Sequence, residues 1–102
     1  MRREFQRDIY DSLDEFVREY SSKYNEEGEN SRGMDFSYKN INYRLCREYD
    51  DVFYIYIVIN DEFKELVICN SMEELLVAKV IDNVEFKEIV MDEKNTIIYG
   101  KD

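Results

Sequence analysis

The sequence predicts a single α+β domain with a long N-terminal amphipathic helix, a three-stranded antiparallel sheet, one or two short helices and a short C-terminal strand. Apolar residues recur at helical spacing over residues 2–25, whereas β-branched and aromatic residues dominate residues 41–70. The chain has 102 residues, no proline and three glycines, so we expect one folded unit over residues 1–102 without a linker.

The N-terminal helix is predicted from one apolar stripe. Its members recur at the spacing that keeps side chains on one face of a helix, for about six turns. They are Phe5, Ile9, Leu13, Phe16, Val17, Tyr20 and Tyr24. Residues 25–33 are mostly polar and hold two of the three glycines, so we expect a loop there.

The central strands are predicted over residues 41–49, 52–60 and 63–70. The middle segment is a continuous β-branched and aromatic run, which is typical of a strand buried on both faces. Two acidic pairs are short enough to form two-residue hairpin turns, namely Asp50-Asp51 and Asp61-Glu62. Another short strand, over residues 34–38, is expected at an edge of the sheet.

These turns imply a register, and the register sorts the side chains onto two faces. Leu45 would face Tyr56, and Arg47 would face Tyr54 with its guanidinium over the ring. The resulting tyrosine-rich face would be covered either by the protein's own helices or by a partner. The opposite, apolar face would form the core, with members Cys46, Phe53, Ile55, Ile57, Ile59, Leu66 and Ile68. Cys46 and Cys69 would then lie on opposite faces and form no disulfide.

The pattern changes after Asn70. Ser71 is a favourable N-cap, and the acids Glu73 and Glu74 follow it in the first turn. A helix is therefore predicted over residues 72–80. Residues 84–92 fit a helix or a strand, and we favour a second short helix. A final strand is predicted over residues 96–99.

The charge of the chain points to a basic partner. The net charge is −10, with −3 over residues 1–50 (12 acids, 9 bases) and −7 over residues 51–102 (12 acids, 5 bases). Such a surface repels nucleic acid and anionic membranes and attracts basic proteins. No apolar stretch is long enough for a membrane span and no signal peptide is present, so we expect a cytoplasmic protein.

Catalytic motifs are missing from the sequence. The chain has no histidine, which removes the commonest general base, and it has no glycine-rich phosphate loop. Two cysteines without histidine do not make a four-ligand metal site. We therefore expect a binding protein without catalytic residues, metal or cofactor.

The candidate partner-binding residues are acids and two tyrosines. Glu4, Asp8, Asp11 and Glu15 form one row along the predicted helix. Neighbouring acids of this row are about 4.5–6 Å apart along the helix axis, which resembles the spacing of phosphates along a nucleic-acid strand. The predicted hairpin tips Asp50, Asp51, Asp61 and Glu62 would extend this acidic surface. Tyr54 and Tyr56 complete the set.

These acids, together with Glu73, Glu74, Asp82 and Glu85, give the chain a resemblance to a known group of proteins. In size, acidity and element order it resembles small acidic phage inhibitors of CRISPR nucleases (anti-CRISPR proteins). The resemblance implies a DNA mimic that occupies the DNA-binding groove of a defence nuclease. Two alternatives remain: an immunity or antitoxin protein that neutralises a nuclease toxin, and a homo-oligomeric structural or regulatory protein that associates through its tyrosine-rich face.

Overall fold

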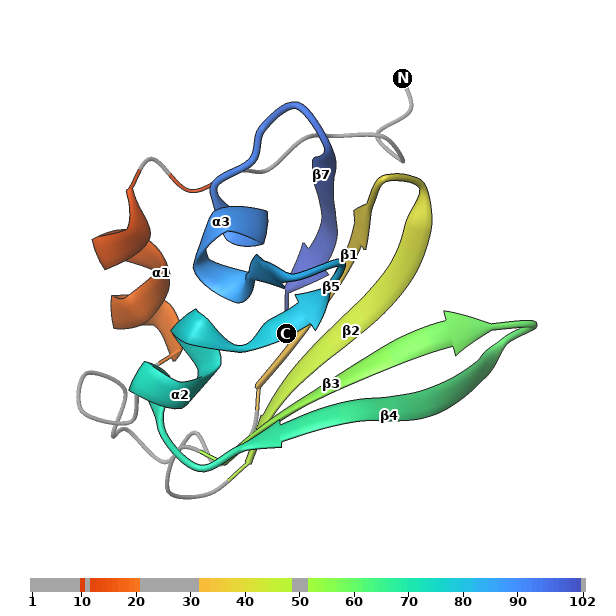
Figure 1. The fold of residues 1–102 in the computed structure, drawn as a ribbon, viewed down its shortest axis with the longest axis horizontal. Helices are drawn as coiled ribbons and strands as arrows, with labels where there is room; N and C mark the ends of the chain where they lie inside the picture. The colour runs from red at the N-terminus through yellow and green to blue at the C-terminus, as the bar shows by residue number, and fades with distance from the viewer. Residues whose placement is uncertain (1–9, 11, 21–31, 49–51, 102) are drawn as a thin grey trace.

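A five-stranded antiparallel sheet forms the centre of the structure, with its strands in the order β4-β3-β2-β1-β7. The structure is a computed structural model that describes Tyr10 and residues 12–20, 32–48 and 52–101. Its elements are α1 (Leu13–Tyr20), β1 (Arg32–Tyr38), β2 (Ile41–Glu48), β3 (Val52–Ile59), β4 (Glu62–Cys69), α2 (Met72–Val77), β5 (Lys79–Ile81), β6 (Val84–Glu85), α3 (Phe86–Val90) and β7 (Thr96–Lys101). The helices gather on one side of the sheet, beside the small β5–β6 hairpin (Figure 1).

The fold is mainly β, so the predicted α+β balance and the three-stranded sheet are wrong. The difference begins with β1, which does not lie at an edge but pairs with β2 on one side and β7 on the other. Its apolar residues Met34, Phe36 and Tyr38 alternate with polar ones and are buried, as suits an internal strand with one core face. The predicted C-terminal strand is confirmed as β7, and it forms an edge of the sheet.

The long N-terminal helix is also wrong, because α1 begins only at Leu13 and Tyr10 lies outside it. Ser12 caps the helix: its Oγ accepts a hydrogen bond from the Glu15 N–H at 3.3 Å. Ser12 and Glu15 have the spacing of a capping box, which marks a helix start within the longer apolar stripe. The remaining parts of the predicted helix, residues 2–9, 11 and 21–25, lie outside the described residues.

Three of the described hairpins turn through two residues that both have positive φ, as in type I′ turns. The pairs are Lys39-Asn40, Asn60-Asp61 and Asp82-Asn83, with φ between 49° and 69°. Asparagine and aspartate tolerate this left-handed region, so these turns form without glycine. The predicted turn at Asp61-Glu62 is wrong by one residue, because Glu62 already pairs with Ile59.

The connection between β2 and β3 is shifted in the same way. Asp50 and Asp51 lie outside the described residues, but Glu48 pairs with Val52, which leaves three residues between the strands instead of two. A shift of one residue moves every side chain of a strand to the other face. The predicted pairing of β2 with β3 is therefore wrong throughout.

The corrected register redistributes the residues of β2 between the two faces. Leu45 faces Ile55, and Arg47 faces Phe53 on the core side, where its side chain is buried rather than placed over Tyr54. Cys46 moves to the side of the tyrosines. The two cysteines still lie on opposite faces, each on the face opposite to the one predicted, and both are free.

The core lies between the sheet and the helices. Phe86 of α3 contacts both layers, with its ring centroid 5.9 Å from those of Phe16 in α1 and Phe36 in β1. The other fully buried apolar side chains include Tyr20, Met34, Leu45, Phe53, Ile55, Leu75, Ile89 and Ile98. Burial of these side chains supplies the main favourable term in folding.

The C-terminal half follows the predictions more closely. Ser71 caps α2 as expected, and its Oγ accepts a hydrogen bond from the Glu74 N–H at 3.1 Å. The helix ends at Val77, before residue 80, because Ala78 is extended and its carbonyl accepts the Phe86 N–H at 2.9 Å. α3 confirms the helix favoured within residues 84–92, although the first two of these residues form β6.

The left-handed turns give a stability prediction. Asn60→Val should lower the free energy of unfolding by about 1–2 kcal/mol, because a β-branched residue is strained at positive φ. Asn60→Gly should be neutral or slightly stabilising. Urea unfolding of both variants measures the difference, and equal losses for valine and glycine would show that the turn conformation is not the cause.

The position of Phe86 gives a second prediction. Phe86→Ala should lower the free energy of unfolding by about 3–5 kcal/mol, because it leaves a cavity between two layers. Val77 is 52% exposed on α2 and provides the matched control, since Val77→Ala should change stability by no more than about 0.5 kcal/mol. Thermal and denaturant unfolding test both variants. A loss below about 1 kcal/mol at Phe86 would contradict the described core.

Candidate protein-binding surface

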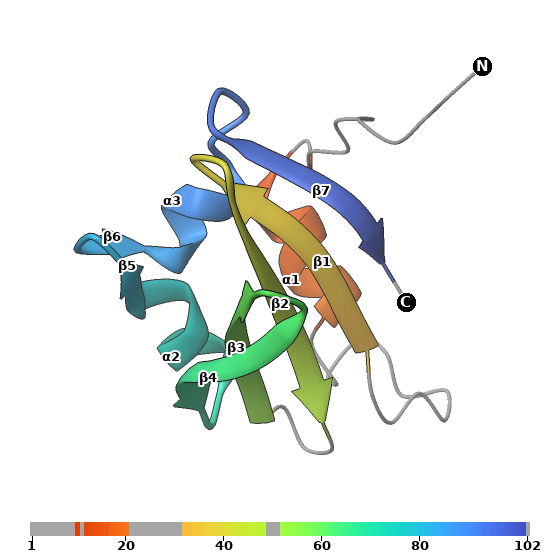
Figure 2. The ribbon, with the colours of Figure 1, turned by 90° about the vertical axis from the view of Figure 1, so that its right-hand side faces the viewer.

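One face of the five-stranded sheet carries no helix in the part of the chain that the structure describes. Figure 2 shows the strands from this side, with α1 behind them. We call it the open face, and strand alternation places on it Asp35, Asn42, Arg44, Cys46, Glu48, Val52, Tyr54, Tyr56, Val58, Phe63, Glu65, Ile68 and Tyr99. Phe63 is 60% exposed, and Ile68 and Tyr99 are each 47% exposed. Such a gathering of exposed apolar side chains on one face often marks an interaction site.

Three aromatic rings run in sequence across β3 and β4 of the open face. Tyr54 and Tyr56 point the same way because they are two residues apart on one strand, and their rings stack at 6.2 Å with an interplanar angle of 9°. Phe63 meets Tyr56 edge-on at 6.0 Å. The predicted pair Tyr54 and Tyr56 is thus extended by Phe63 of the neighbouring strand.

A cross-strand ion pair lies beside these rings. Arg44 of β2 faces Asp35 of β1, and its Nη1 is 2.6 Å from the Asp35 Oδ1. The Arg44 side chain is mostly buried, whereas half of the Asp35 side chain is exposed. Partly exposed pairs of this kind contribute at most about 1 kcal/mol to stability, so the pair mainly fixes the two side chains in position.

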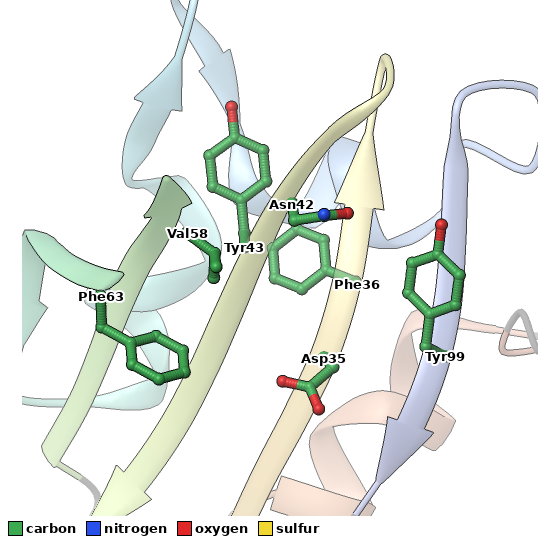
Figure 3. A pocket seen from close by; sticks show the side chains of 7 residues that line it. All are labelled: Asp35, Phe36, Asn42, Tyr43, Val58, Phe63 and Tyr99. Carbon is green, nitrogen blue, oxygen red and sulfur yellow. The ribbon is translucent and has the colours of Figure 1, made fainter. Parts of the chain in front are cut away.

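The open face is hollowed in two adjoining places. The larger hollow, about 360 Å³, lies between Phe63 of β4 and Tyr99 of β7 (Figure 3). Its other lining residues are Asp35, Phe36, Asn42, Tyr43 and Val58. A second hollow of about 280 Å³ is lined by Arg44, Cys46, Tyr56 and Phe63. Side chains from both edge strands line the larger hollow, so the sheet is curved enough to form a concave surface.

The Cys46 thiol in the second hollow is not an activated nucleophile. Burial raises its pKa, and the neighbouring Arg44 offsets only part of this increase. Burial likewise raises the pKa of Cys69 on the core face. Both thiols are therefore protonated near neutral pH, whereas the thiolate is the reactive form. Within the described residues, no group of His, Cys, Asp or Glu side chains has the arrangement of a metal site.

The predicted site residues that the structure describes do not all lie on one surface. Tyr54 and Tyr56 lie on the open face, whereas Glu15 is exposed on α1 in the helical layer. Asp61 and Glu62 are exposed at the end of the β3–β4 hairpin. The other predicted acids lie outside the described residues: Glu4, Asp8, Asp11, Asp50 and Asp51. The structure therefore separates the two tyrosines from Glu15.

Sequence reasoning missed Asp35, Arg44, Phe63 and Tyr99. The missing information was the register, since the turn at Asn60-Asp61 places Phe63 opposite Val58. The one-residue error placed the neighbours of the tyrosines on the wrong face. The Asn-Asp pair was the available signal, because both residues tolerate the left-handed conformation that a type I′ turn requires.

Exposed acids are found mainly in the helical layer. Glu73 of α2, Asp82 of the β5–β6 turn and Glu88 of α3 are exposed and make no ion pair with another described residue. Among the described arginines, Arg18 pairs with Asp14 within α1 and neutralises that one acid of the layer, whereas Arg44 pairs with Asp35 on the sheet. No described helix combines the length and hydropathy needed to cross a bilayer.

The raised pKa values of two thiols and two tyrosine hydroxyls give a prediction of how stability depends on pH. Burial raises the pKa of Cys46, Cys69, Tyr43 and Tyr56 in the folded protein. The unfolded chain therefore releases these protons at a lower pH than the folded protein does. The free energy of unfolding should stay constant up to about pH 8 and fall above about pH 9. Denaturant unfolding across this range measures the change. A stability that stays constant or rises above about pH 9 would contradict these environments.

Comparisons with protein-family models, curated proteins and solved structures found no significant match to this chain. The resemblance to anti-CRISPR inhibitors thus gains no support from a relative.

Proposed function

We propose that this chain is a non-catalytic, acidic protein-binding domain that docks on a basic partner protein through its open face. The observation that carries the proposal is the contrast between the two faces of one sheet. One face is buried under the helices, whereas the other presents Tyr54, Tyr56, Phe63 and Tyr99 around shallow hollows.

The residue types of the open face favour a protein as the ligand. Tyrosine, phenylalanine and arginine are enriched in protein–protein interfaces, and aromatic side chains dominate their binding energy. Tyr56 is half-buried, and burial raises the pKa of its hydroxyl, so the group stays a neutral hydrogen-bond donor near pH 7. Phe63 lines both hollows and is therefore the best candidate for an anchor residue.

The charge of the chain favours a basic partner. Residues 52–101 carry ten acids and five lysines, a sum of −5. The ion pair between Lys87 and Glu85, at 3.4 Å, neutralises one of these acids. An excess of this kind repels nucleic acids directly and speeds association with basic proteins at low salt. A basic surface that normally binds nucleic acid suits this chain, so we extend the proposal to inhibition of a nucleic-acid-binding protein, such as a defence nuclease or a nuclease toxin.

The first experiment identifies and characterises such a partner. The full chain serves as bait in a host lysate, and the captured protein is identified by mass spectrometry and purified. We expect its Kd to rise at least about tenfold between about 50 mM and 0.5 M salt, because screening weakens acidic–basic attraction. Duplex DNA should compete with the chain for the same partner.

The second experiment tests the open face directly with the purified partner. Phe63→Ser should weaken binding at least about tenfold, because it removes a central aromatic contact. The control Val77→Ser removes an exposed apolar side chain from α2 and should leave the Kd unchanged. Equal effects of the two variants would exclude the open face. A chain that self-associates through Phe63 at high salt, without capturing a basic protein, would instead be a homo-oligomer.

A further inference from the structure

We propose that the larger hollow of the open face receives an arginine side chain of the bound protein. The guanidinium would bind the Asp35 carboxylate and stack on the ring of Tyr99, which neighbours Asp35 because β7 pairs with β1, while Phe63 closes the opposite side of the hollow. This inference rests on the proposed function, since it names the group of the partner that the open face recognises. The residues concerned are shown in Figure 3.

The walls and floor of the hollow suit a planar cation. Phe63 and Tyr99 enter from opposite edge strands, and about half or more of each side chain is exposed. Aromatic faces attract a cation within about 6 Å of the ring centroid. Asp35 lies between them on β1, and no basic residue is among the described lining residues of this hollow. The hollow thus combines an anionic group with aromatic walls.

The Asp35 carboxylate can accept a second cation. Its Oδ1 accepts from Arg44 at 2.6 Å, while Arg44 itself lines the neighbouring hollow. A carboxylate has about four acceptor positions, so Oδ2 is available to another donor. Asn42 contributes an exposed amide beside it. Arg44 therefore orients Asp35 towards the hollow without filling its acceptor capacity.

Arginine fits these groups better than other ligands. A guanidinium is planar, stacks on aromatic rings and presents several N–H donors to a carboxylate, whereas an ammonium group is compact and strongly hydrated. A phosphate or nucleotide would find no basic side chain among the described lining residues of this hollow. At about 360 Å³ the hollow is near the lower limit of ligand pockets, which suits one long side chain.

The test uses N-acetylarginine amide as the probe and N-acetylcitrulline amide as its uncharged analogue. Backbone amide shifts of the full chain are followed by NMR during titration with each compound. We expect arginine to shift the resonances of Asp35, Asn42 and Tyr99, and citrulline to bind at least about tenfold more weakly, because it lacks the charge. Equal binding of both probes, or shifts confined to the helical layer, would overturn the proposal.

Three variants make this test specific. Asp35→Asn should weaken arginine binding about tenfold, while Glu93→Gln removes the same charge from an exposed position outside the open face and should have no effect. Tyr99→Leu keeps the Asp35–Arg44 pair and should weaken binding about threefold or more by removing one ring. Unchanged affinity in both Asp35→Asn and Tyr99→Leu, with folding verified by the same spectra, would overturn the proposal.

The two proposals fail in different ways. If a basic partner is captured through Phe63 but Asp35→Asn binds it normally and arginine causes no shifts, the arginine site is wrong and the protein-binding function stands. If arginine binds in the hollow but no basic partner is captured, the protein-binding function is wrong.

Discussion

The single aromatic cluster around Phe86 is the interaction on which the rest of the structure depends. It joins α3 to Phe16 of α1 and Phe36 of β1, and so holds the helical layer on one side of the sheet. The helices have only eight, six and five residues in the described chain, too few to cover both faces of five strands. Packing against the Phe86 side therefore leaves the opposite face without a helix from the described part of the chain.

That uncovered face is stable in water because of the residues it carries. Tyr54 and Tyr56 are half-buried, and their rings stack at 6.2 Å. Asp35 and Arg44 place a neutralising pair among apolar neighbours. The exposed acids of the helical layer act over a distance of about 8–10 Å, whereas aromatic groups act only in contact.

Some local sequence patterns predicted the observed structure, although the Ser12 cap of α1 and the turn at Asn60-Asp61 were missed. The alternation within β3 separates Phe53 and Ile55 from Tyr54 and Tyr56, and this division is the observed one. Ser71 caps α2 through its own hydroxyl. The site was only partly predictable, because Tyr54 and Tyr56 were identified whereas their neighbours depend on pairing between strands. The turn falls at Asn60-Asp61 because both residues tolerate positive φ, and its position decides which side chains of β4 lie beside the tyrosines.

The sequence by itself determined the net charge, the absence of histidine and its catalytic roles, the strand character of residues 52–69 and the cap at Ser71. Each follows from composition or from groups only a few residues apart. The tertiary structure decided that β1 lies inside the sheet, that Arg47 is buried and that Asp35 meets Phe63 and Tyr99 in one hollow. Those features join residues distant in the chain. Their formation depends on burying one complete face of the sheet, which no local pattern specifies.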